Sequence, residues 1–354
     1  MGLADPIIQR QLLKAVLSLP RPVLRVASGG KAVHVGGRAL DPRFQFLVHA
    51  AKRYASTDGL PEGKARETLS QQFSICAGER EPGVVLEDLE IAGPNGPIPA
   101  RLYRSAEQHP EMALIVYAHG LEAGETDGFE SCDSLCSILA RCGHAPVLAI
   151  TCRPSGERPF RICRADVLAA YRYGADNAAR FGARAHAAAI AGDSIGGALA
   201  ALLCQALKRD GEAQPALQLL IYPWLDLSAG STTKDLYDEA TLPAQDVEAW
   251  AAGFLGPEDD PADSEVSPLK TEDVSGLAPA IVVTAGFDPL VDQGGEYAEK
   301  LKAAGDPIVY RCYDQLVHGF AAFTGVVPAA DIACREIAGL VREGLQGRIP
   351  APAA

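Results

Sequence analysis

The stretch that decides the fold is residues 187–203, AAAIAGDSIGGALAALL. Its first five residues form an apolar run typical of a buried strand, and its last seven have the composition of a helix. Between them, Gly192 and Gly196 flank Ser194 in a Gly-x-Ser-x-Gly pattern. A strand-to-helix turn this sharp leaves no room for flanking side chains and lifts the serine hydroxyl above the sheet. We therefore predict that Ser194 is a catalytic nucleophile.

Two further residues follow Ser194 in an order that is specific to one fold. Asp288 and His318 each come after an apolar, strand-like run. The order serine, aspartate, histidine is that of the α/β-hydrolase triad, and it differs from the orders in the chymotrypsin and subtilisin folds. A second acid in the same segment, Asp292, is interpreted as the start of the next helix. The expected catalytic residues are Ser194, Asp288 and His318.

The segment after residues 114–118 has the position of the oxyanion loop in this fold. The apolar run leads directly into HGLE at residues 119–122. Oxyanion donors are backbone N–H groups, so a change of side chain does not by itself remove them. We expect the N–H groups of Gly120, Leu121 and Ile195 to hold the tetrahedral oxyanion.

The rest of the chain predicts an α/β fold built on a mostly parallel sheet. Two strands, 84–91 and 98–103, are joined by a Gly-Pro-Asn-Gly turn. Apolar runs then alternate with helical patterns, at residues 114–118, 146–151, 187–191, 217–222, 280–285 and 308–313. This alternation indicates a central sheet with helices on both faces, as in the α/β-hydrolase fold.

These motifs resemble those of the hormone-sensitive-lipase-like α/β-hydrolases, which include the bacterial family IV carboxylesterases. The resemblance covers roughly residues 84–345. The family's GDSAGG is similar to GDSIGG here, and its YRLAPEHPF segment to RPSGERPF at residues 153–160. Further matching segments are LIYPWLD at 220–226, SPL at 267–269 and DPLVD at 288–292. The resemblance implies a serine carboxylesterase whose N-terminal segment forms part of a cap over the active site.

The chain departs from the family pattern beside the predicted nucleophile. The family's oxyanion loop begins His-Gly-Gly-Gly, whereas Leu121 and Glu122 stand at the last two of these positions. A leucine forbids some positive-φ geometries, and a carboxylate opposes an oxyanion unless it points away or pairs with a cation. Ile195 replaces the family's alanine and should narrow the acyl side of the pocket.

The predicted domain organisation is a catalytic domain with a helical cap in two parts. Residues 1–82 are expected to form the N-terminal cap segment, with an amphipathic helix over residues 7–17. Residues 83–354 form the α/β-hydrolase domain, and residues 227–266 are inserted as the second part of the cap. Val247, Trp250, Ala251 and Phe254 follow helical spacing in this insertion, and the acidic run 258–265 is expected to be a solvated loop.

Composition excludes several classes of partner. The chain has 354 residues, is 48% hydrophobic and carries a net charge of −13. This charge argues against a nucleic-acid partner and disfavours docking on anionic membranes. No apolar stretch of about 20 residues predicts membrane insertion, and no secretory signal is evident near the start, so the expected location is the cytoplasm.

The nine cysteines indicate reduced thiols in a cytoplasmic protein better than a disulfide framework. Cys132, Cys136 and Cys142 invite a metal interpretation. However, the first two are four residues apart in a helical pattern whose apolar face they can fill, and no His pair or Cys-x-x-Cys completes a zinc set. The triad chemistry requires neither a metal nor an organic cofactor.

The function expected from these features is hydrolysis of small, short-chain carboxylic esters through an acyl-enzyme on Ser194. The same triad also serves amidases, acyltransferases and peptidases, although no added propeller-like repeat supports a peptidase. A non-catalytic ligand-binding relative of the fold is a further alternative, favoured only by the altered oxyanion loop. A scaffold that mainly dimerises is another, and a homo-oligomer is compatible with any of these.

Overall fold

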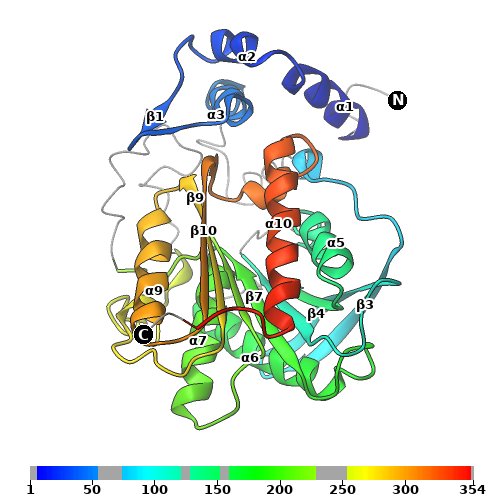
Figure 1. Ribbon diagram of the computed structural model, residues 1–354, viewed down its shortest axis with the longest axis vertical. Helices are drawn as coiled ribbons and strands as arrows, with labels where there is room; N and C mark the ends of the chain where they lie inside the picture. Colours follow the sequence, from blue (N-terminus) through cyan, green and yellow to red (C-terminus); the bar gives the residue numbers. More distant parts are fainter. Residues whose placement is uncertain (1–5, 55–73, 121–127, 152–158, 229–252, 352–354) are drawn as a thin grey trace.

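The fold is a twisted eight-stranded sheet with helices on both faces, in a computed structural model that describes residues 6–54, 74–120, 128–151, 159–228 and 253–351 (Figure 1). The spatial order of the strands is β10-β9-β8-β7-β5-β6-β4-β3. Their bounds are β3 Val84–Gly93, β4 Gly96–Ser105, β5 Leu114–His119, β6 Val147–Thr151, β7 Ala188–Asp193, β8 Gln218–Ile221, β9 Ala280–Phe287 and β10 Ile308–Val317. The six strands from β10 to β6 pair in parallel, whereas β4 runs antiparallel to both β3 and β6. The predicted mostly parallel sheet and its antiparallel hairpin are confirmed.

The apolar runs of the sequence become strands that are buried on both faces. Successive residues of β5 belong to different cores: Leu114 and Val116 pack with helices on one face, and Ile115 and Tyr117 on the other. One face is covered by α6 Pro159–Asn177, α7 Ile195–Arg209 and α9 Val291–Ala303, and the other by α5 Asp133–Cys142 and α10 Pro328–Leu345. Two short 3₁₀ turns, η2 Pro268–Lys270 and η3 Phe320–Phe323, complete the described core.

The N-terminal elements lie beyond the carboxyl ends of the parallel strands, above the sheet in Figure 1. They are α1 Pro6–Leu17, α2 Arg21–Ala27, the two-stranded hairpin of β1 His34–Val35 and β2 Arg38–Ala39, and α3 Pro42–Tyr54. Helix α1 confirms the amphipathic helix predicted over residues 7–17. The Asp41 N–H donates to the Gln315 carbonyl at 3.0 Å, and Phe44 packs edge-to-face on Phe323. These contacts attach the N-terminal segment to the core near the end of β10.

Part of the predicted insertion is described. Val247, Trp250 and Ala251 lie outside the described residues, whereas the Phe254 ring packs on Phe160 with centroids 5.7 Å apart. The acidic run after Phe254 is a loop with mostly exposed side chains, as predicted, except at Asp259. Asp259 is buried, accepting hydrogen bonds from the Arg161 guanidinium and the Gly256 N–H. The expectation of a fully solvated run is therefore wrong at Asp259, because a cation 98 residues away in sequence neutralises it.

The eight cysteines in the described ranges are all free thiols, and Cys132 and Cys136 are buried at the start of α5. Burial raises the pKa of both thiols above the usual value. Among the residues that the structure describes, no group of three or more His, Cys, Asp or Glu side chains is arranged to hold a metal ion. None of the described helices combines the length and apolar character needed to cross a bilayer.

Candidate active site

The predicted nucleophile occupies a strained turn between β7 and α7. Ser194 has φ 51° and ψ −119°, a conformation that side-chain-bearing residues rarely adopt and that is concentrated at functional sites. A Cβ added at Gly192 would lie 2.3 Å from the Gly196 carbonyl oxygen, and one added at Gly196 would lie 2.0 Å from the Ala118 carbonyl oxygen. Both flanking positions therefore exclude any side chain, which is why the pattern requires glycine there.

The three predicted triad residues lie within hydrogen-bond reach of one another. His318 Nε2 is 3.0 Å from Ser194 Oγ, and His318 Nδ1 is 2.8 Å from Asp288 Oδ2. Each residue directly follows a parallel strand, Ser194 after β7, Asp288 after β9 and His318 after β10. Because the carboxyl ends of parallel strands meet at one edge of the sheet, residues far apart in sequence converge there. The arrangement can transfer a proton from Ser194 Oγ to His318 Nε2.

Asp288 is held in place by the start of α9. Its Oδ1 accepts the Leu290 N–H at 2.8 Å, which leaves Oδ2 directed at His318. Asp288 is 0% exposed, whereas Asp292 is exposed in the first turn of α9. Asp292 is the second residue of α9 rather than its cap, and an acid in that first turn interacts favourably with the helix dipole.

Tyr222 is a site residue that the sequence motifs did not single out. It follows β8 with φ 35°, and its buried ring lies 4.9 Å from the His318 ring, centroid to centroid. Phe320 in turn packs edge-to-face on Tyr222, with the two ring centroids 5.2 Å apart. The Tyr222 ring thus packs against the imidazole that faces both Ser194 and Asp288, and Phe320 packs against Tyr222. The positive φ at a bulky residue was not foreseeable from the LIYPWLD motif.

The three backbone N–H groups expected to bind the oxyanion differ in their surroundings. Ile195 is the first residue of α7, so its N–H has no partner within the helix and lies at the positive end of the helix dipole. The Gly120 N–H, by contrast, donates to Asp193 Oδ1 at 3.0 Å. A backbone amide has one hydrogen, so this bond argues against Gly120 as a donor to an oxyanion and corrects the prediction. Leu121 lies outside the described residues.

Asp193 joins the elbow to the segment that precedes the oxyanion loop. Its Oδ1 accepts the Tyr117 hydroxyl at 2.7 Å and the Gly120 N–H, and it lies 2.9 Å from His119 Nδ1. His119 Nε2 in turn lies 2.8 Å from Ser131 Oγ. Burial alone would raise the pKa of Asp193, but the His119 ring and the three hydrogen bonds outweigh it and hold that pKa below its usual value. His119 is recognisable in the sequence only as the start of the loop, because its partners Asp193 and Ser131 lie 74 and 12 residues away.

We expect Asp193→Asn to lower the free energy of unfolding by about 2–4 kcal/mol at pH 7, because charge-assisted hydrogen bonds on a buried group are lost. The folded-state pKa of Asp193 is depressed, so its contribution is present above the unfolded value of 3.8 and is lost as pH falls through the folded pKa. Urea unfolding at pH 7 and at decreasing pH measures this difference. The exposed-residue variant Asp176→Asn is the control. If the difference in unfolding free energy between the wild type and Asp193→Asn stays constant below about pH 4, the Asp193 carboxylate does not have the depressed pKa assigned to it.

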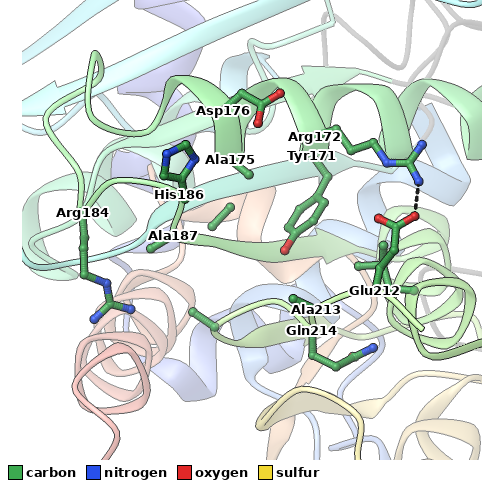
Figure 2. Close-up of a pocket in the computed structure, with 13 residues that line it drawn as sticks. Tyr171, Arg172, Ala175, Asp176, Arg184, His186, Ala187, Glu212, Ala213 and Gln214 are labelled. Carbon is green, nitrogen blue, oxygen red and sulfur yellow. Dashed lines mark hydrogen bonds and ion pairs between the residues drawn. The ribbon is translucent and has the colours of Figure 1, made fainter. Parts of the chain in front are cut away.

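A separate cavity of about 500 Å³ opens at the other end of β7. Figure 2 shows Tyr171 and His186 at its walls, together with an ion pair between Arg172 and Glu212 at 2.5 Å. Ala188, the first residue of β7, also lines it, whereas Ser194 follows the last residue of that strand. The length of the strand separates the cavity from the triad, so it does not form the substrate pocket of Ser194.

Comparison with known proteins agrees with this geometry. A sequence profile described as alpha/beta hydrolase fold matches residues 115–322. Carboxylic ester hydrolase LipN of Mycobacterium tuberculosis is 36% identical over 320 residues, covering 87% of this chain and 84% of that protein. An ethyl acetate hydrolase of Pseudomonas putida is 32% identical over 278 residues, covering 77% of this chain and 87% of that protein.

Solved structures show the same fold. An ester hydrolase from the metagenome of Lake Arreo, complexed with a bipyridine phosphonate derivative, superposes with a TM-score of 0.78 at 34% identity. The match covers 86% of this chain and 98% of that one. A hyperthermophilic esterase from Pyrobaculum calidifontis superposes with a TM-score of 0.74 at 30% identity, with coverage of 86% and 98%.

Proposed function

From the premise that the chain belongs to the hormone-sensitive-lipase-like family of α/β-hydrolase-fold carboxylic ester hydrolases, we propose that it hydrolyses short-chain esters through Ser194, His318 and Asp288. The observation that carries the proposal is the continuous chain of hydrogen bonds from Ser194 Oγ through the imidazole to Asp288. A ligand-binding relative has no need of a strained serine that faces a histidine. The same geometry would serve an amidase, so the choice of an ester as the bond that is cleaved is based on the activities of the relatives.

The proposed reaction proceeds in two halves. Ser194 Oγ attacks the ester carbonyl carbon as its proton passes to His318 Nε2, and His318 then protonates the departing alcohol. Asp288 accepts the Nδ1–H, fixes the imidazole tautomer and stabilises the imidazolium. Water, deprotonated by His318, releases the carboxylic acid and regenerates Ser194. We assign the oxyanion to the N–H groups of Ile195 and Leu121, with the N-terminus of α7 favouring the negative charge.

We further propose that residues 1–82 and 227–266 form a two-part cap over this site, with residues 83–354 as the catalytic domain. The hydrogen bond between Asp41 and Gln315 supports it, as does the ion pair of Arg38 with Asp314 at 3.0 Å, because both lie a few residues before His318. The contact of Phe254 with Phe160 supports the second part. The free thiols favour the cytoplasm as the location.

Labelling with a fluorophosphonate probe tests the proposed nucleophile directly. The probe should modify the wild-type protein at Ser194, as read by mass spectrometry of the digested chain, and p-nitrophenyl acetate should compete with it. A protein that resists the probe while hydrolysing no ester in a panel from acetate to palmitate would favour the ligand-binding alternative.

The preferred acyl chain is expected to be short, about two to six carbons. Each methylene that fits adds about 0.8 kcal/mol of burial, but a site narrowed by Ile195 stops gaining after a few carbons. Ile195 is 3% exposed directly beside Ser194, where the related family has alanine. Ile195→Ala should therefore move the optimum in a p-nitrophenyl ester series toward longer chains, with Ile332→Ala, at an exposed position of α10, as the control. Faster wild-type hydrolysis of palmitate than butyrate would refute the narrow-pocket argument.

A further inference from the structure

The outer surface of α1 and α2 concentrates apolar side chains that are exposed. Nine large apolar side chains are exposed among the described residues, and six of them lie within residues 7–26. These six, which we call the α1–α2 face, are Ile7, Leu12, Val16, Leu19, Val23 and Val26. Isolated exposed apolar residues are ordinary, but six of them within 20 consecutive residues indicate an interaction surface.

The two helices are anchored so that this face is directed away from the protein. Leu17 and Leu24 are at most 1% exposed and belong to the core that also contains Phe44 of α3. Arg10 donates to the carbonyls of Ser74 and Ile75 from the same inner side. Figure 1 shows α1 and α2 as the outermost layer of the molecule, beyond α3. The apolar face is therefore held outward by packing on its opposite side.

The charge of this segment is opposite to that of the protein as a whole. Residues 6–54 contain nine Lys and Arg residues and one acid, Asp41, which is buried and 3.8 Å from Arg43. The segment thus carries +8, and the remainder of the chain carries −21 to give the total of −13. Within the described ranges, the side chains of Lys14, Arg21 and Lys31 form no ion pair. These three cations lie in the same stretch of the chain as the α1–α2 face, Lys14 and Arg21 between its residues and Lys31 five residues after Val26.

We propose that the α1–α2 face docks peripherally on an anionic lipid surface. Helices that combine exposed Leu, Val and Ile with Lys and Arg lie in the headgroup region of such membranes, where apolar burial and charge attraction act together. A second copy of this chain fits the face less well, because two surfaces of the same positive sign would repel. The total charge of −13 is a property of the whole chain, whereas a membrane senses the charges that lie near it. Salt screens the interaction between exposed charges beyond about 10 Å, so the negative charge elsewhere on the protein does not prevent docking of this face.

Flotation of the purified full chain with vesicles tests the docking. Vesicles of mixed phosphatidylglycerol and phosphatidylcholine should carry the protein, whereas pure phosphatidylcholine vesicles should carry much less, and added salt should release it. Lys14→Gln, Arg21→Gln and Lys31→Gln combined should weaken partitioning on the order of a hundredfold, since each cation contributes about fivefold. Leu12→Ser, Val23→Ser and Val26→Ser combined should abolish flotation, because they remove the apolar contribution to binding.

Matched controls distinguish the face from general surface effects. Val85→Ser combined with Ile332→Ser removes exposed apolar groups elsewhere and should leave flotation unchanged. Thermal unfolding verifies that each variant is folded. Ser194→Ala should float like the wild type, so failure of the esterase proposal does not affect this one. Equal flotation with neutral and anionic vesicles, or flotation unaffected by either triple variant, would overturn the proposal. So would a lipid-independent dimer that the apolar triple variant dissociates in sedimentation analysis.

Discussion

Ser194→Ala is expected to lower kcat/KM for p-nitrophenyl butyrate by at least about a thousandfold, leaving only what the oxyanion donors and binding supply. The hydroxyl that His318 Nε2 faces at 3.0 Å is the only part of the residue removed. Alanine keeps the Cβ, so the strain of the φ 51° backbone is the same in both proteins. Initial rates of purified protein and active-site titration with a fluorophosphonate measure the effect.

The fold of the variant is expected to be unchanged, so its thermal unfolding should match that of the wild type. Ser275→Ala, which removes an exposed hydroxyl remote from the triad, is the control and should retain full activity. Retention of more than about a tenth of wild-type turnover by Ser194→Ala would exclude Ser194 as the nucleophile.

The sheet and the triad were predictable because each depends on local sequence. A parallel strand that is buried on both faces appears as an uninterrupted apolar run, and the loop after its carboxyl end carries the functional residue. At Gly192 and Gly196 neighbouring backbone atoms approach so closely that only glycine fits. The turn that carries the nucleophile can therefore be recognised in a single sequence. Those signals place Ser194, Asp288 and His318 without knowledge of their contacts.

The features that could not be predicted depend on contacts between distant segments. The Gly120 N–H bonds to Asp193 at a sequence separation of 73, and no local pattern reveals which acceptor it faces. Asp259 is buried for the same reason, since its partner is Arg161 on another element. A net charge likewise hides where charges gather: residues 6–54 carry +8 in a chain of −13, and the structure adds that the apolar side chains of this segment are exposed.

The two acids after β9 should differ sharply on mutation, and Asp288→Asn is expected to lower kcat by a thousandfold to ten-thousandfold, as for triad aspartates generally. The asparagine Oδ1 keeps the Leu290 N–H bond, so its amide NH₂ takes the place of Oδ2 and faces His318 Nδ1. Two donors cannot face each other, and the imidazole must then carry its hydrogen on Nε2. In that tautomer it cannot accept the proton of Ser194.

Asp292→Asn removes the same charge four residues further along and supplies the matched comparison. It leaves the hydrogen bond between Asp288 and His318 intact and weakens the favourable interaction with the α9 dipole, which contributes about 0.3–1 kcal/mol of folding free energy. Its kcat should stay within about threefold of wild type, since a loss below 1 kcal/mol in folding does not alter the triad. Stopped-flow or steady-state rates on p-nitrophenyl esters, with both variants shown to be folded by circular dichroism, measure the contrast. If Asp292→Asn proves the more damaging, the histidine is oriented by a different acid, and the assignment of Asp288 fails while that of Ser194 stands.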